Sequence, residues 1–293
     1  MRFGIEGGYI MNNLLKFIFF TTASYCITKI YASTSLMPSQ LHSAPEFANH
    51  VDGHSFSAPS GSEIHYRVKD LSMFRNTEEQ SDQPNVLVVF HPNKASIPMY
   101  YHSVLDFNYL ASHTAYSHLV FWDYPNSGFS KAPQWLADKN LLVSDGISLV
   151  ETVAEKMTGG DISKLSFYGW SLGGGVASEV ALALQNKYGD EGVISSITLD
   201  RTFTSISDHL QKNLYMPKTI ADFASWALGI DFNTEWAFET LKAGKKKVYY
   251  IKDDDRIGDA VFKSGQTGEF IEVVELIDHG DMSHLYTPTT IEF

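Results

Sequence analysis

A serine between two glycines is the feature of this 293-residue sequence best placed to do chemistry. Gly169, Ser171 and Gly173 form a Gly-x-Ser-x-Gly pattern, with a strand-like aromatic run before it and an Ala-rich helical pattern after it. At such a tight turn the serine hydroxyl is raised above the sheet, and glycines flank it because a Cβ would strike the neighbouring strand or helix. The pattern predicts Ser171 as a nucleophile. A glycine-rich turn without chemistry is the alternative interpretation.

The segments around this turn have the patterns of strands and helices in alternation. Residues 61–69 alternate as an edge strand does, and residues 140–157 carry apolar residues at helical spacing. Apolar runs typical of buried strands occupy residues 85–90, 118–122, 193–199, 247–251 and 270–276. With the elbow pattern, these segments make residues 85–281 resemble the α/β-hydrolase family of serine hydrolases.

The resemblance implies an α/β fold, in which a mostly parallel central sheet has helices on both faces. It also implies a small helical insert after the sixth strand, at residues 206–245, which often forms a cap over the pocket in this family. Trp226, Leu228, Trp236, Phe238 and Leu241 lie in that stretch. For most of these apolar residues, plain core packing is the expectation.

The resemblance also places the catalytic acid at a fixed offset after a late strand. Asp255 matches that offset after residues 247–251, with Lys252 where the family usually has glycine. Asp253 and Asp254 lie beside it, and the three acids would equally suit a solvated loop or a weak cation site.

Two other acids follow predicted strands. Asp200 is the alternative catalytic acid, because some family members place the acid after the strand at residues 193–199, but Asp200 and Arg201 would also form a simple ion pair. Asp123 begins a segment that resembles the family's Asp-x-x-Gly-x-Gly-x-Ser turn, with Asn126 in place of the first glycine. The resemblance implies that Asp123 braces this turn.

The catalytic base should follow the last strand. His279, in the segment His279-Gly280-Asp281, resembles the histidine of the family's Gly-His-Asn-Asp motif. His284 lies five residues further on and is the alternative base, because one sequence fixes spacing and leaves the loop geometry open.

Two main-chain N–H groups are expected to form the oxyanion hole. One is that of Leu172, the residue after the nucleophile. The resemblance places the other at Asn93, after His91 and Pro92, where the family usually has His-Gly. Pro92 has no N–H and cannot itself donate. An ordinary strand-to-helix loop is the alternative for this segment.

The composition is that of a globular protein and excludes several classes of function. A net charge of -12 argues against a nucleic-acid partner. The one cysteine, Cys26, lies in an apolar N-terminal segment, so neither a disulfide nor a cysteine nucleophile is expected in the body of the chain. The sequence has neither His and Cys at metal-ligand spacing nor a nucleotide-binding glycine pattern, so no cofactor is expected.

The sequence predicts three parts along the chain. Residues 1–33 resemble an export signal, with Lys16 before an apolar run and Ala32 before a cleavage point; Met11 is a candidate start. Residues 34–59 have the composition of a linker, and residues 60–293 form one α/β domain. We therefore expect an exported protein, with a cytoplasmic or membrane-associated one as the alternative.

The order Ser171, Asp255, His279 is that of the α/β-hydrolase triad. It predicts hydrolysis of an ester or thioester through an acyl-enzyme. The expected substrate is a small molecule or lipid with an acyl chain, including one at a membrane surface. A non-catalytic binding scaffold and a serine peptidase of the same fold are the alternatives.

Overall fold

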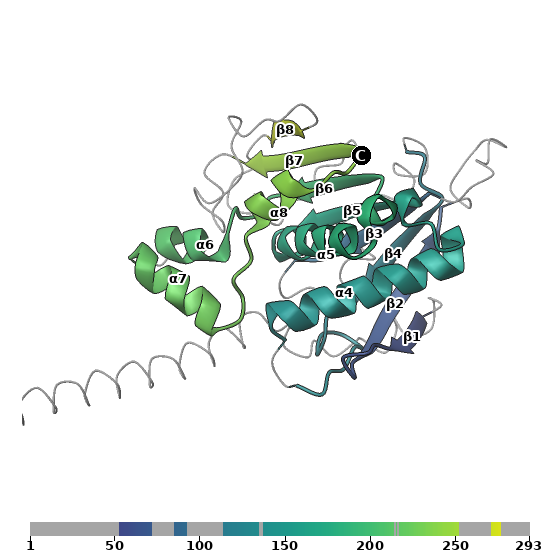
Figure 1. Ribbon diagram of the computed structural model, residues 1–293, viewed down its shortest axis with the longest axis horizontal. Helices are drawn as coiled ribbons and strands as arrows, with labels where there is room; N and C mark the ends of the chain where they lie inside the picture. The colour runs from purple at the N-terminus through teal and green to yellow at the C-terminus, as the bar shows by residue number, and fades with distance from the viewer. Residues whose placement is uncertain are drawn as a thin grey trace, which may run out of the picture.

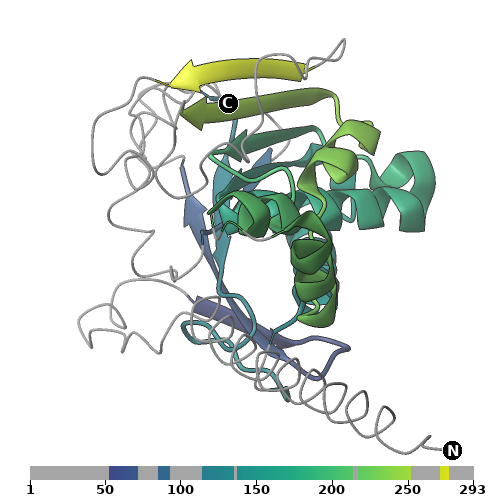
Figure 2. The same ribbon diagram turned by 90° about the vertical axis from the view of Figure 1, so that its left-hand side faces the viewer.

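The computed structural model describes residues 53–71, 85–92, 114–134, 137–213, 215, 217–251 and 271–276. These residues form an eight-stranded sheet in the order β1-β2-β4-β3-β5-β6-β7-β8 (Figures 1 and 2). The pairs β1–β2 and β2–β4 are antiparallel, and every other pair is parallel. The strands are β1 Gly53–Ser57, β2 Glu63–Asp70, β3 Val86–Phe90, β4 His118–Trp122, β5 Leu165–Trp170, β6 Ser196–Asp200, β7 Lys245–Ile251 and β8 Ile271–Leu276.

The central strands are buried on both faces, which explains their continuous apolar sequences. All five residues of β3 and all six of β5 are buried. Phe90 of β3 packs against Phe167 of β5 and Trp122 of β4, with ring centroids 5.0 and 5.7 Å apart. The core therefore lies around the strands that end at the serine.

Two long helices, α4 (Lys139–Val153) and α5 (Leu172–Tyr188), lie side by side on one face of the sheet (Figure 1). Asp138 caps α4, because its side chain accepts a hydrogen bond from the N–H of Leu141 at 2.8 Å. Short helices cover Ala154–Thr158, Ile162–Lys164 and Gly189–Gly192. In the part of the chain that the structure describes, no helix is both long and apolar enough to cross a membrane.

The insert after β6 contains α6 (Ile206–Asn213), α7 (Lys218–Ala227) and α8 (Thr234–Thr240). Figure 1 shows α6 and α7 as a hairpin beyond the carboxyl ends of the parallel strands, while α8 lies beside α5. Lys246 fixes the end of α8, because its Nζ donates to the carbonyls of Phe238, Glu239 and Leu241 at 2.9, 3.2 and 2.7 Å. Burial lowers the pKa of Lys246.

The mostly parallel sheet and the insert after the sixth strand confirm the predicted fold. Two details differ. Gly53–Ser57 forms the edge strand β1 within the predicted linker, so the strand expected at the edge, β2, is the second in the sheet. Phe238 and Leu241 are buried as expected, whereas Trp226 and Trp236 are exposed. The predicted leader at residues 1–33 lies outside the described residues.

Candidate active site

Ser171 occupies a strained turn between the central strand and the first long helix after it. Strand β5 ends at Trp170 and α5 begins at Leu172, so a single residue connects them. The backbone of Ser171 has φ 53° and ψ -119°, in a region that residues with a Cβ seldom adopt. The sequence pattern predicts this turn, and the positive φ confirms its strained geometry.

The glycines on either side are required by close contacts between main chains. A Cβ on Gly173 would lie 2.0 Å from the carbonyl oxygen of Phe90 and 2.8 Å from that of His91. A Cβ on Gly169 would lie 2.6 Å from the carbonyl oxygen of Gly173. Helix α5 therefore starts in direct contact with the end of β3, which only glycine permits.

Hydrogen bonds with β6, with the segment after it and with α5 hold the serine turn. The N–H of Ser171 donates to the carbonyl of Asp200 at 2.9 Å. The hydroxyl of Thr202 donates to the carbonyl of Ser171 at 2.6 Å, and the N–H of Gly174 donates to the same carbonyl at 3.0 Å. Thr202 also packs on Gly174, where a Cβ would lie 2.5 Å from the threonine Oγ1. These contacts hold both the nitrogen and the carbonyl of the nucleophile residue.

Asp200 and Arg201 form a buried ion pair next to the serine. Arg201 donates to the carboxylate of Asp200 through Nε and Nη2, each at 2.7 Å, and both side chains are fully buried. The hydroxyl of Tyr168 also donates to Asp200 Oδ2, at 2.5 Å. The guanidinium lies 4.7 Å from the ring centroid of Trp170, the residue before the nucleophile.

The hydrogen bonds of Asp200 show what its carboxylate does in this structure. Both carboxylate oxygens of Asp200 accept hydrogen bonds from Arg201, and one also accepts from Tyr168. The ion pair that the sequence offered as the alternative role of Asp200 is therefore present. Arg201 itself has a positive φ of 45°, and its N–H donates to the carbonyl of Tyr249 on β7. The pair thus connects three adjacent strands at the serine.

The segment after β3 approaches the serine turn through His91. The His91 ring stacks on Tyr124 with centroids 3.8 Å apart, and the Tyr124 hydroxyl donates to the His91 carbonyl at 2.8 Å. Burial lowers the pKa of His91 to about 4, so the ring is neutral at pH 7. Its Nδ1 lies 2.8 Å from the carbonyl oxygen of Pro92, which requires the proton on Nδ1. The buried, neutral ring of His91 is therefore held in place beside the expected oxyanion loop.

Leu172, one of the two expected oxyanion donors, lies at the start of α5. It is the first residue of α5, and N–H groups in the first turn of a helix have no acceptor within that helix. The helix dipole adds partial positive charge at the same point. The second expected donor, Asn93, lies outside the described residues.

Asp123 braces the turn after β4, as the sequence predicts. Its buried carboxylate accepts from the N–H of Phe129 at 2.9 Å, and its carbonyl accepts from the Ser130 hydroxyl at 2.8 Å. Asn126 has a φ of 60°, in the left-handed region that favours glycine. Asp123 therefore has a structural role.

The structure brings together Ser171, Leu172, the two elbow glycines and Asp200. Asp255, His279 and His284 lie outside the described residues, so their roles stay predictions. Sequence reasoning missed Tyr168 and Thr202, whose contacts need the pairing of β5 with β6. The sequence feature that could have indicated them is the presence of polar residues near the carboxyl ends of two adjacent strands. Within the described residues, no three His, Cys, Asp or Glu side chains are grouped to hold a metal ion.

Comparison with known proteins identifies the fold. No known family model matches the sequence, and no curated protein sequence does. Among solved structures, an α/β hydrolase from Vibrio vulnificus has a TM-score of 0.55 at 14% identity, over 79% of this chain and 74% of that one. An esterase from Pyrococcus furiosus has a TM-score of 0.53 at 12% identity, over 82% and 87%. An esterase from Pyrobaculum calidifontis has a TM-score of 0.52 at 15% identity, over 90% of this chain and 84% of that one. With Ser171 at the turn after the central strand, the chain therefore has the α/β-hydrolase fold.

Proposed function

We propose that this protein is a serine hydrolase that cleaves carboxylic esters or thioesters through an acyl-enzyme. The observation that carries the proposal is the backbone of Ser171, held at φ 53° between the central strand and the start of α5. A strained nucleophile position persists only where the surrounding structure imposes it, and such positions concentrate at active sites. The esterases among the structural neighbours agree with this choice of reaction.

In the proposed mechanism, Ser171 Oγ attacks the carbonyl carbon of the substrate while His279 takes the hydroxyl proton. Asp255 orients the imidazole and stabilises it when it is protonated. Collapse of the tetrahedral intermediate breaks the bond to the alcohol or thiol, which leaves with the proton from His279. Water then attacks the acyl-enzyme by the same route in reverse and releases the acid.

The N–H groups of Leu172 and Asn93 stabilise the oxyanion in this mechanism. Removing one such donor from a serine hydrolase costs about 3 to 4 kcal/mol of transition-state stabilisation. The close packing beside Leu172 supports this role. Because residue 173 is a glycine, α5 can begin in contact with the end of β3, which fixes the position of the Leu172 N–H. A preorganised donor needs no rearrangement at the moment of reaction.

The substrate we propose is an ester with an acyl chain. Hydrolysis of p-nitrophenyl esters of graded chain length tests this, with wild type, Ser171→Ala, His279→Ala and His284→Ala compared. We expect Ser171→Ala and His279→Ala to lose activity and His284→Ala to keep it. Loss at His284 alone would move the base to that residue. Equal activity in wild type and Ser171→Ala would refute the proposal.

A further inference from the structure

Helix α7 turns its large apolar side chains toward solvent and its small residues toward the domain. Its buried residues are small: Ala221 and Ser225. Its large apolar residues face solvent, with Ile220 54%, Phe223 61% and Trp226 67% exposed. A surface helix normally turns its apolar stripe toward the core.

These three residues, which we call the α7 outer face, form one continuous surface. They are spaced three residues apart, so at 3.6 residues per turn they fall on one side of the helix. The rings of Phe223 and Trp226 are in contact, with centroids 5.9 Å apart. Tyr215, 91% exposed, lies three residues before the helix begins. Of the large apolar residues that the described chain exposes, most lie in this short segment.

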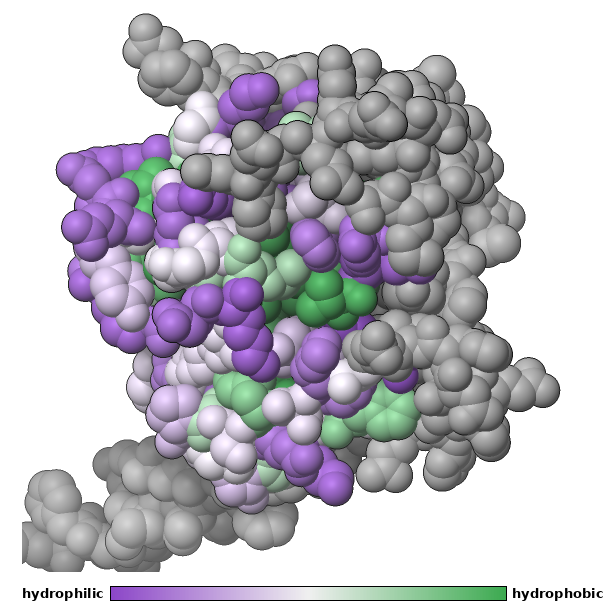
Figure 3. All heavy atoms as spheres, turned by 90° about the vertical axis from the view of Figure 1, so that its right-hand side faces the viewer, coloured by the Kyte–Doolittle hydropathy of each residue, from purple (hydrophilic) through white to green (hydrophobic). Residues whose placement is uncertain are grey.

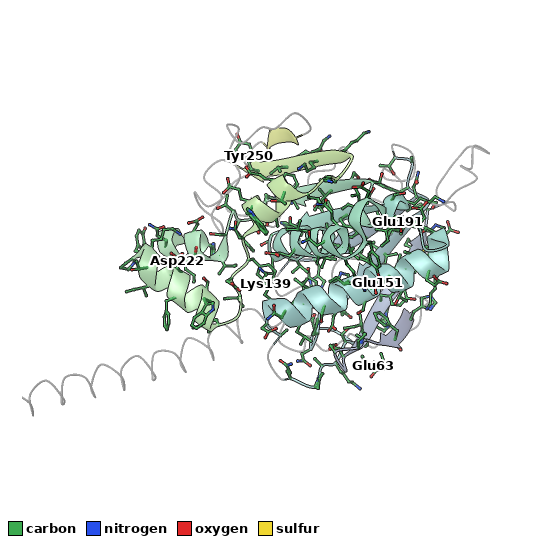
Figure 4. All side chains as sticks on the ribbon, viewed as in Figure 1. Glu63, Lys139, Glu151, Glu191, Asp222 and Tyr250 are labelled. Carbon is green, nitrogen blue, oxygen red and sulfur yellow. The ribbon has the colours of Figure 1, made fainter. Side chains whose placement is uncertain are left out.

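The α7 outer face lies on a projecting part of the molecule. The α6–α7 hairpin extends beyond the carboxyl ends of the strands, and Figure 4 shows Asp222 of α7 out on this projection. Figure 3 shows the opposite face, where hydrophilic residues are mixed with apolar ones, some of which meet near its centre. Outside this segment, the large apolar residues that the described part of the chain exposes are Tyr188 and Trp236. The α7 outer face lies toward the end of the sheet where Ser171 lies.

Area and shape argue against a protein partner. The exposed parts of the three side chains amount to roughly 400 Å², since large aromatic side chains bury about 150 to 250 Å² each. A stable protein interface buries about 800 Å² of each partner, polar rim included, so the α7 outer face alone supplies about half of one. A projecting ridge would also need a complementary groove, whereas a bilayer surface deforms around it.

The charge of the α6–α7 hairpin is also compatible with a bilayer surface. Residues 206–227 contain two acids, Asp208 and Asp222, and two bases, Lys212 and Lys218, so their net charge is zero in a chain of net charge -12. Lys218 Nζ lies 3.0 Å from Asp222 and 3.5 Å from Asp208. The hairpin therefore carries no net charge within an acidic molecule, so its charges do not repel it from an electrically neutral surface.

We propose that the α7 outer face docks on the surface of a phospholipid bilayer, with Phe223 and Trp226 inserted at the level of the headgroups. Indole and phenyl rings beside aliphatic side chains are the groups that interfacial helices insert. Docking there turns the serine end of the sheet toward the lipid. The inference rests on α7 and not on the chemistry at Ser171.

The sign of the charge makes the proposal specific. With a net charge of -12, the chain is repelled by anionic lipids. Vesicles of phosphatidylcholine should therefore bind the protein better than vesicles that also contain phosphatidylserine, and added salt should reduce that difference. Binding that requires phosphatidylserine would contradict the proposal.

Two matched tryptophans allow a direct test on the full chain. Trp226 and Trp236, on α7 and α8, are similarly exposed at 67% and 55%. The sequence has no tryptophan before Trp122, so the N-terminal 121 residues contribute no indole emission. Phosphatidylcholine with brominated acyl chains quenches only an indole that reaches the bilayer. We expect these vesicles to quench the wild-type emission, Trp226→Phe to lose most of that quenching and Trp236→Phe to keep it.

Partition supplies a second readout. Phe223→Ser/Trp226→Ser should bind phosphatidylcholine vesicles at least about tenfold more weakly, while Trp236→Ser stays near wild type. Quenching that survives in Trp226→Phe would overturn the inference. So would a wild-type dimer that the double variant converts to a monomer, because a second copy would then cover this face. Neither readout uses hydrolysis, so failure of the proposed reaction leaves this test intact.

Discussion

The hydroxyl of Thr202 donates a hydrogen bond to the main-chain carbonyl of Ser171 at 2.6 Å. This contact connects the segment after β6 to the residue that carries the proposed nucleophile. Because the N–H of Ser171 is also held, by the carbonyl of Asp200, the turn is fixed at both ends. Strain at the serine is therefore maintained by hydrogen bonds from the neighbouring strand as well as by the packing of the glycines.

Thr202→Val tests the first of these bonds, because it keeps the shape of the side chain and removes the donor. We expect kcat to fall up to about tenfold with KM little changed, as the loss of one hydrogen bond of about 1 kcal/mol predicts. Thr202→Ser retains the hydroxyl and should stay near wild type. Steady-state kinetics on a p-nitrophenyl ester makes the comparison. If Thr202→Ser loses activity while Thr202→Val keeps it, packing on Gly174 rather than the hydrogen bond is what matters.

Gly173→Ala should destabilise the fold strongly, because the new Cβ would meet the carbonyl oxygen of Phe90 at 2.0 Å. Overpacking against a backbone atom costs about 3 kcal/mol or more. Gly159→Ala is the matched control: its φ is 67° and nothing lies near the added Cβ, so only the backbone penalty of about 1 kcal/mol applies. Urea unfolding measures both variants. Similar losses in the two would show that α5 can move away from β3.

Asp200→Asn and Asp255→Asn separate a structural acid from a catalytic one. Asp200→Asn removes the charge that the buried Arg201 pairs with, so we expect a loss of about 3 to 5 kcal/mol in the free energy of unfolding. Asp255→Asn should keep the stability and lower kcat. Thermal unfolding and kcat are measured for each variant below its melting temperature. A folded Asp200→Asn that lacks activity, beside an active Asp255→Asn, would reverse the assignment.

Asp145 of α4 predicts a dependence of stability on pH. Its buried side chain accepts from the Ser60 hydroxyl at 2.5 Å. Burial raises the pKa of Asp145, although hydrogen bonds from Ser60 and Ser62 lower it in part. With the folded pKa above the unfolded one, the folded state holds the proton longer, so this group's contribution to stability falls as pH rises between the two values.

Asp145→Asn removes that titration. The free energy of unfolding of the variant, relative to wild type, should therefore rise as the pH increases above about 4, the usual pKa of an aspartate. Urea unfolding at a series of pH values gives this difference, and Ser144→Ala, an exposed change on the same helix, serves as the control. A difference that falls over this range would mean that the folded carboxyl has a lowered pKa.

The sequence predicted what depends on local pattern. The strand at residues 118–122 has the predicted bounds, because its apolar run is buried on both faces in the sheet. Strand β1 escaped prediction because only Phe56 of its five residues is even partly buried, so main-chain pairing with β2 defines it. An edge strand of this kind leaves little hydrophobic pattern to detect.

The remaining differences depend on contacts between distant segments. The roles of Asp200 and Thr202 follow from the pairing of β5 with β6, which brings residues some 30 positions apart into contact. Trp226 is exposed because α7 projects from the domain and presents small residues to its neighbour. Helical spacing of apolar residues alone does not tell which side of a helix meets the core.

Covalent labelling of Ser171 is the measurement that tests the central claim most directly. Folded wild-type protein is treated with a fluorophosphonate, the adduct is detected by intact mass, and its position is mapped by peptide sequencing. The proposed mechanism predicts one adduct, on Ser171, that is absent from a folded Ser171→Ala variant. An unlabelled wild type, or the same adduct in Ser171→Ala, would contradict it and leave a binding scaffold as the better account of this fold.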